Sequence, residues 1–156
     1  MRELWRLKVV RPVLALLKQG LTPEKLALTI ALGIGLGLIP ILGSTSVACA
    51  LAAFVFGLNQ PAIQAVNYLV YPLQILCLIP FFKLGSYLFQ AAEVRIGIGE
   101  LTAMVRADFL GAVRELWTLT WHALFAWVVV ATPLVLVLYF VLRPILTMAL
   151  KRGEAV

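Results

Sequence analysis

The feature that most constrains this chain is a run of 57 consecutive residues, Leu26 to Phe82, without Asp, Glu, Lys, Arg or His. A second run of 27 residues, Leu116 to Leu142, carries only His122. Runs beyond about 18 apolar residues are typical of helices that cross a membrane. Only 13% of the residues are charged, about half the usual share of a soluble domain. The sequence therefore predicts an all-α integral membrane protein that forms a single membrane domain over residues 1–156.

The charged residues are placed asymmetrically along the chain. Six basic residues precede the first run and three follow the last, whereas the segment between the runs holds four basic and four acidic residues. Basic flanks are typical of segments that stay in the cytoplasm, so the pattern predicts a multi-pass protein with both termini cytoplasmic. Because the flanks account for the net charge of +6, no nucleic-acid partner is expected.

Helix-breaking residues divide the chain into six predicted segments. These are a basic amphipathic interfacial helix (1–20), a helical hairpin (21–57), a kinked crossing (58–90), a far-side interfacial segment (91–115), a transmembrane helix (116–142) and a cytoplasmic tail (143–156). We expect Arg143-Pro144 to end the transmembrane helix, and Pro72 and Pro80 to kink the first crossing. A rival topology treats residues 60–90 as a second hairpin, which would put the C-terminus outside.

The hairpin has arms too short to span a bilayer. Thr22 is predicted to cap the first arm, and Gly57 to end the second. Arms of 14–17 residues reach about 20–25 Å, whereas a hydrocarbon core is about 30 Å thick. The sequence therefore predicts a re-entrant hairpin that turns within the membrane at Ile39 to Gly43. Small residues repeat every four positions on both arms and favour close packing between them.

Polar residues inside the charge-free run form the candidate site. Gln60, Gln64, Asn67, Tyr71 and Gln74 are spaced for one helical face, which is costly at membrane depth unless it meets protein or water. Two interpretations stay open: hydrogen bonds that hold the hairpin or a second subunit, or a groove that contacts a lipid headgroup. At the hairpin tip, Ser44 is expected to cap a half-helix whose N-terminus favours an anion such as phosphate. The predicted substrate-binding residues are Gly43, Ser44, Thr45, Gln64, Asn67, Tyr71 and Gln74.

No pattern in the chain indicates catalysis, a cofactor or a metal. Cys49 and Cys77 lie inside the apolar run and are interpreted as small apolar side chains. His122 is interpreted as an interfacial histidine beside tryptophans. We therefore expect no enzymatic activity, no cofactor and no metal site.

Several short motifs resemble one known family. Leu21-Thr22-Pro23-Glu24-Lys25-Leu26-Ala27, the glycine-rich arm after it, Pro40-x-x-Gly43-x-Thr45 and Leu58-Asn59-x-Pro61-Ala62 resemble the bacterial family catalogued as domain of unknown function 2062. The resemblance covers roughly residues 20–90. It implies a bacterial inner-membrane protein near envelope lipid or glycan handling, because some members are fused to glycosyltransferase-like domains. The chain departs from the family pattern at Tyr71-Pro72-Leu73-Gln74, where the family often has Asn-Pro followed by Thr.

Two functions are consistent with these features. The first is handling of a lipid or polyprenyl-phosphate, by transport or by positioning in the bilayer, with membrane lipids as partners. Because two crossings make a thin transporter, this function predicts a homo-oligomer. The alternative is a non-catalytic scaffold or assembly subunit that binds another membrane protein, such as a glycosyltransferase.

Overall fold

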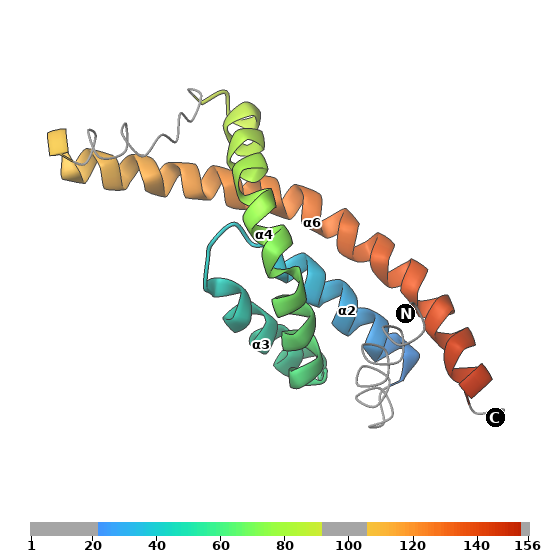
Figure 1. The fold of residues 1–156 in the computed structure, drawn as a ribbon. Helices are drawn as coiled ribbons and strands as arrows, with labels where there is room; N and C mark the ends of the chain where they lie inside the picture. The colour runs from blue at the N-terminus through green and yellow to red at the C-terminus, as the bar shows by residue number, and fades with distance from the viewer. Residues whose placement is uncertain (1–21, 92–105, 154–156) are drawn as a thin grey trace, which may run out of the picture.

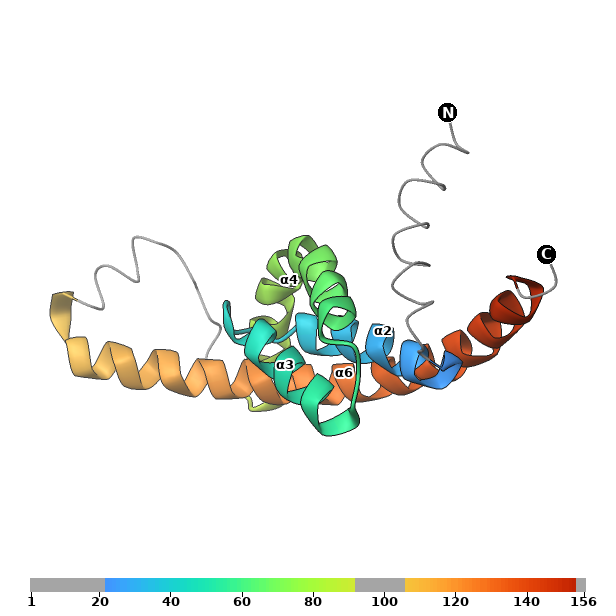
Figure 2. The same ribbon diagram turned by 90° about the horizontal axis from the view of Figure 1, so that it is seen from below.

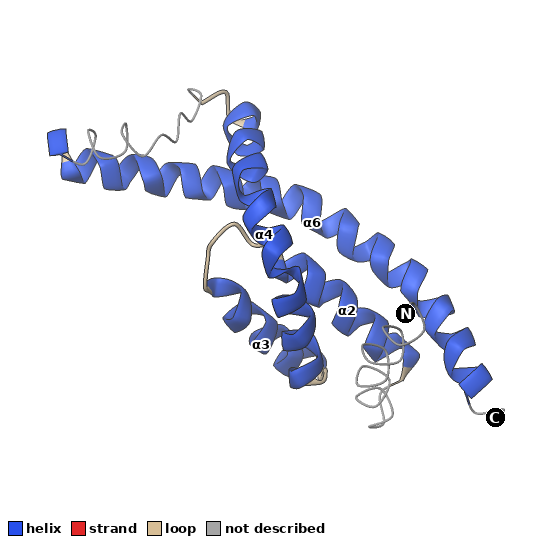
Figure 3. Cartoon of the chain, in the orientation of Figure 1, coloured by secondary structure: helices blue, strands red, loops and turns tan. Residues whose placement is uncertain are grey.

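The computed structural model describes residues 22–91 and 106–153, and every regular element in these ranges is a helix (Figure 1, Figure 3). The elements are α2 (Pro23–Gly37), α3 (Ser44–Phe56), α4 (Gln60–Leu88) and α6 (Phe109–Gly153). The prediction of an all-α fold is confirmed for this part of the chain. The amphipathic helix predicted over residues 1–20 lies outside the described residues, as does most of the predicted interfacial segment.

Helices α2 and α3 form the predicted hairpin, with the ends that local sequence signals indicate. The Thr22 side chain accepts a hydrogen bond from the backbone N–H of Lys25 at 3.3 Å, and Pro23 opens α2. Gly57 ends α3 in the left-handed conformation, with φ 59°, which glycine adopts without steric cost. The predicted caps at Thr22 and Gly57 are therefore confirmed.

Helix α2 lies at the centre of the bundle, where it packs against each of the other three helices. Its small residues make this possible. A Cβ added at Gly33 would lie 2.8 Å from the Val66 side chain of α4, and one added at Gly35 would collide with Val135 of α6. The glycines expected to close the hairpin therefore serve instead to bring α2 against α4 and α6.

Helix α4 is one continuous helix of 29 residues, bent along its length (Figure 1). Asn59 caps its start by accepting a hydrogen bond from the N–H of Ala62 at 2.9 Å. Pro72 and Pro80 lie inside the helix, so the prediction of a single helix through both prolines is confirmed. The rival prediction of a second hairpin over residues 60–90 is wrong.

Helix α6 is longer at both ends than predicted. It begins at Phe109 rather than residue 116, and it continues through Arg143-Pro144 to Gly153. The predicted helix start at residue 116 and the predicted helix end at Arg143-Pro144 are therefore wrong. A proline removes one backbone hydrogen bond, and here helix-forming residues on both sides continue the helix past it. Figure 2 shows α6 bowed rather than broken.

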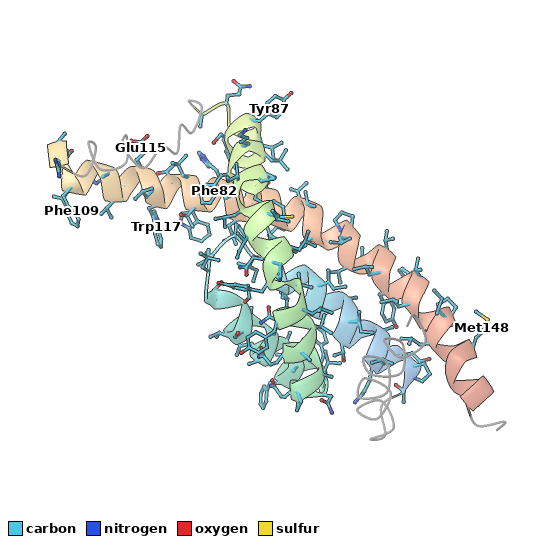
Figure 4. All side chains as sticks on the ribbon, in the orientation of Figure 1. Phe82, Tyr87, Phe109, Glu115, Trp117 and Met148 are labelled. Carbon is cyan, nitrogen blue, oxygen red and sulfur yellow. The ribbon has the colours of Figure 1, made fainter. Side chains whose placement is uncertain are left out.

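Two helices are long and apolar enough to cross a membrane: α4 and the stretch Phe109–Met148 of α6. Their outer sides carry large apolar side chains. The first part of α6 extends beyond the other described helices, and Phe109, Glu115 and Trp117 project from it (Figure 4). The fold is thus a small helical core with a largely apolar exterior.

Candidate functional site

The amide side chains of α4 point towards α3. The Nε2 atom of Gln60 donates to the Ala50 carbonyl at 2.9 Å, and Nε2 of Gln64 donates to the Ser46 carbonyl at 2.9 Å. Residues spaced four apart lie on one face of a helix, so successive amides bond successive turns of α3. The predicted common face is confirmed for these residues, and it is turned inward.

Deeper along α4, two buried amides reach the start of α3 and the loop before it. The Nδ2 atom of Asn67 lies 3.3 Å from Oγ of Ser46 and 3.4 Å from Oε1 of Gln64. The Nε2 atom of Gln74 donates to the Ile39 carbonyl at 2.7 Å, and the Gln74 side chain is buried. The hairpin tip is therefore brought against the polar face of α4.

Tyr71 does not share the inward position of the amides. Its side chain is 45% exposed, and within the described part of the chain no hydrogen bond engages its hydroxyl. The levels of α4 above and below it are held by Gln74 and Asn67. The tip residues 41–43, which lie in the sequence between the partners of those two amides, Ile39 and Ser46, are themselves exposed.

The tip differs from the prediction in how α3 begins. Gly43, with φ 87°, is the N-cap, and no side chain caps the helix. The Ser44 hydroxyl instead donates to the Ile41 carbonyl at 2.9 Å, so the expectation that Ser44 caps the half-helix is wrong. Thr45 is buried. Of the three predicted tip residues, Ser44 thus stabilises its own turn, and Gly43 supplies the left-handed conformation that the turn requires.

The amide donors of α4 are used within the chain, and the hairpin sequence has little positive charge. All four amides of the inward face donate to partners within the chain. The Gln74 Oε1 atom is buried and has no hydrogen-bond partner among the described residues. The nearest cation in sequence before the tip, Lys25, donates from Nζ to the Gly57 carbonyl at 3.2 Å, at the other end of α3. No cationic side chain thus follows Lys25 until Lys83 to hold a phosphate at the tip.

A second cluster of polar atoms lies where α4 and α6 cross. The Phe89 ring stacks on His122, with ring centroids 4.3 Å apart, and meets Phe125 edge to face. Ser86 Oγ and His122 Nδ1 are buried without a partner in the described part of the chain. Over residues 22–91 and 106–153, no group of three His, Cys, Asp or Glu side chains could hold a metal ion.

Sequence reasoning missed the contacts that join α6 to the core. The indole Nε1 of Trp127 donates to the Gly35 carbonyl at 2.9 Å, which satisfies a carbonyl in the last turn of α2. Gly85 lets α4 touch the backbone of His122, since an added Cβ would lie 2.5 Å from its carbonyl. These partners lie far apart in the chain, and no local pattern indicates them.

Comparison with known proteins places the chain in one family. No curated protein and no solved structure matches it. One family model, described as an uncharacterised protein conserved in bacteria, matches residues 8–154. The match is wider than the resemblance over residues 20–90, because it includes all of α6 through Gly153. The chain therefore belongs to the bacterial family catalogued as domain of unknown function 2062.

Proposed function

We propose that the chain is an integral protein of the bacterial cytoplasmic membrane with both termini in the cytoplasm. Two helices of sufficient length and hydropathy support this placement. The side chains that face outward also support it, since Phe54 and Leu69 are more than four-fifths exposed. Large apolar side chains at that exposure are stable in hydrocarbon and unfavourable in water.

The hairpin then enters the membrane and returns to the same face. Lys25 Nζ contacts the Gly57 carbonyl, so the open ends of α2 and α3 lie at one level, where α4 begins. The bond from Gln74 to Ile39 places the tip about 21 Å along α4 from Gln60. Because a hydrocarbon core is about 30 Å thick, the tip ends within the membrane while α4 continues across it.

Within that membrane the chain acts as a non-catalytic scaffold or assembly subunit for another envelope protein. The observation that carries this proposal is the use of the inward amides, all of which donate to the chain's own hairpin. Polar side chains used in this way fix three helices as one unit. The outward surface is left apolar and free to meet lipid or another membrane protein.

A specific observation favours a second candidate, the handling of a phosphate-headed lipid. Gln74 Oε1 is buried and has no hydrogen-bond partner in the described part of the chain, and the N-cap of α3 is Gly43, which has no capping side chain. An open helix N-terminus attracts anions. This candidate is the weaker of the two, because the sequence has no cationic residue between Lys25 and Lys83.

Native mass spectrometry of the protein released from its own membranes in mild detergent separates the two functions. The scaffold function predicts a stoichiometric complex with another membrane protein. It also predicts that the triple variant Gln64→Leu, Asn67→Leu, Gln74→Leu loses thermal stability together with the complex, because the amides hold the fold. Gln60→Leu, at the exposed end of the same face, serves as the matched control and is expected to keep both the thermal stability and the complex.

The opposite result has a distinct pattern. A chain that carries a phosphate-headed lipid and no protein, and whose triple variant loses the lipid while keeping its melting temperature, would establish the second candidate and refute the scaffold function. Extraction by alkaline carbonate tests the membrane placement itself, since an integral protein stays in the pellet.

A further inference from the structure

One side of α4 is covered by no other described helix. Figure 2 shows α4 standing to one side of α2 and α6 with its outer side free. The outer residues include Leu69 and Leu76, which are 81% and 73% exposed, and Ile79. They lie on the face opposite the amides. This outer face of α4, defined by residues 68, 69, 72, 76, 79 and 80, has no charged side chain, and the Tyr68 hydroxyl is its one polar side-chain group.

The outer face also carries two backbone carbonyls without their helical donors. Pro72 and Pro80 are both exposed on it. A proline has no N–H, so the carbonyls of Tyr68 and Leu76, four residues earlier, receive no hydrogen bond from those positions. No side chain of the described residues donates to either carbonyl. In hydrocarbon such groups are costly, and neighbouring polypeptide normally supplies the missing donor.

A donor of the required kind lies on the same face. Tyr68 is 65% exposed, and its hydroxyl has no hydrogen bond within the described ranges. The hydroxyl proton carries partial positive charge and the carbonyl oxygen partial negative charge. One helix thus presents complementary charges side by side, surrounded by apolar residues, which makes its outer face self-complementary.

We infer that the outer face of α4 is the contact between two copies of this chain, with the Tyr68 hydroxyl of each copy donating to a proline-released carbonyl of the other. A two-fold interface pairs one patch with itself, and a face that holds both donors and acceptors meets that condition. Lipid tails have no donors, and a partner of other sequence would have to bring its own. The inference rests on the membrane placement proposed above and names one partner of the scaffold.

Disulfide cross-linking in native membranes tests the contact. In the full chain with Cys77→Ala, a cysteine is introduced by Leu69→Cys or Leu76→Cys. The matched control is Phe54→Cys, which is more exposed still but lies on α3. Mild oxidation is expected to give covalent dimers at both α4 positions and none at the control. Absence of dimers at the α4 positions, or equal dimers at the control, would overturn the inference.

Energy transfer between labelled chains, diluted in lipid vesicles, tests the hydrogen bonds. The variant Tyr68→Phe is expected to weaken association by about threefold for each of the two hydrogen bonds of the symmetric pair. In a second background, Pro72→Ala with Pro80→Ala, the backbone N–H groups engage the same carbonyls, so Tyr68→Phe is expected to have no effect. An equal effect in both backgrounds would overturn the inference.

The outcomes also separate this inference from the proposed function. A chain that stays monomeric at every lipid dilution, yet forms a complex with a different membrane protein, overturns the second copy and leaves the scaffold function intact. A chain that alkaline carbonate extracts from the membrane refutes both.

Discussion

Gln74 is 1% exposed and lies midway along α4, where its Nε2 bonds the Ile39 carbonyl at 2.7 Å. The loop at the hairpin tip has no regular structure of its own, so its carbonyls need side-chain donors. The Gln74 amide therefore supplies the hydrogen bond that the backbone N–H of a further helical turn would otherwise give to this carbonyl. It fixes the loop against a neighbouring helix by a bond that water cannot replace.

Replacement of Gln74 by leucine is expected to lower the free energy of unfolding by about 1–3 kcal/mol, because the Ile39 carbonyl is left buried without a donor. The control is Gln60→Leu, which removes an amide of the same face at an exposed position and is expected to cost less than about 1 kcal/mol, since water takes over. Circular dichroism during chemical unfolding in mild detergent measures both. An equal loss in the two variants would contradict the role of burial.

The candidate site was partly predictable from residue spacing. Four- and three-residue intervals placed the amides on one face, and burial of Asn67 and Gln74 follows from the cost of polar groups in an apolar environment. The acceptors could not be predicted, because Ile39 lies 35 residues from Gln74. Nor could the turn at Gly43, where backbone conformation rather than the Ser44 side chain starts α3.

At the scale of the elements, α4 crosses α6 at Gly85, where the backbones of the two helices come close together. No other glycine of the described helices has backbone of a neighbouring helix as near. A Cβ at Gly85 would lie 2.5 Å from the His122 carbonyl group and 2.8 Å from the Ala123 nitrogen. Backbone cannot move aside as a side chain can. The crossing thus fixes where α6 sits, and the Phe89 ring closes over it by stacking on His122.

The variant Gly85→Ala is expected to push α4 and α6 apart and to cost about 1–3 kcal/mol, as overpacking does in a close-packed core. Ala65→Ser adds one atom to the exposed side of the same helix and serves as the control, with a change under about 0.5 kcal/mol. Thermal melting in detergent compares the two. A melting temperature of Gly85→Ala equal to that of the unmodified chain would show that the helices can separate without cost.

The ends of α2 and α3 were predictable because the signals are local. Thr22, Pro23 and Gly57 each act on the turn in which they stand. The C-terminal end of α6 was not predictable in this way. Pro144 is a typical helix-ending residue, but in the structure it lies inside α6. Whether a proline ends or bends a helix depends on the helix propensity of the residues after it, and leucine, methionine and alanine after Pro144 continue the helix.

For the molecule as a whole, one ion pair joins the first and last described helices. The Arg143 guanidinium of α6 lies 3.4 Å from the Glu24 carboxylate at the start of α2. Both side chains are about half exposed, so the pair contributes little by itself. Together with the hydrogen bond from Trp127 to Gly35, the ion pair fixes the lengthwise position of α2 against α6, and the two helices run antiparallel.

The pKa of the Glu24 carboxyl lies below its ordinary value of 4.5, chiefly through the backbone N–H of Glu24 itself and further through Arg143. A carboxyl with a lowered pKa stabilises the fold above its unfolded-state pKa, and this contribution is lost as pH falls through the lower folded value. We therefore expect the melting temperature of the unmodified chain to fall more steeply below about pH 4.5 than that of Glu24→Gln.

Arg143→Gln provides the comparison for this pH dependence. It is expected to reduce the acid sensitivity without removing it, since the backbone contribution at Glu24 remains. Melting temperatures of the three proteins from pH 7 to pH 3 supply the measurement. Parallel curves for the unmodified chain and Glu24→Gln would contradict the assignment.

The bond between Gln74 and Ile39 also sets an order for biosynthesis. A ribosome releases the hairpin before residue 74, so during that interval the tip carbonyl has no donor within the chain. Under the membrane placement proposed above, arms of about 22 and 20 Å cannot span the bilayer or satisfy their own turn there. That placement then requires the hairpin to remain with the insertion machinery until α4 emerges, so that the three helices enter the lipid as one unit.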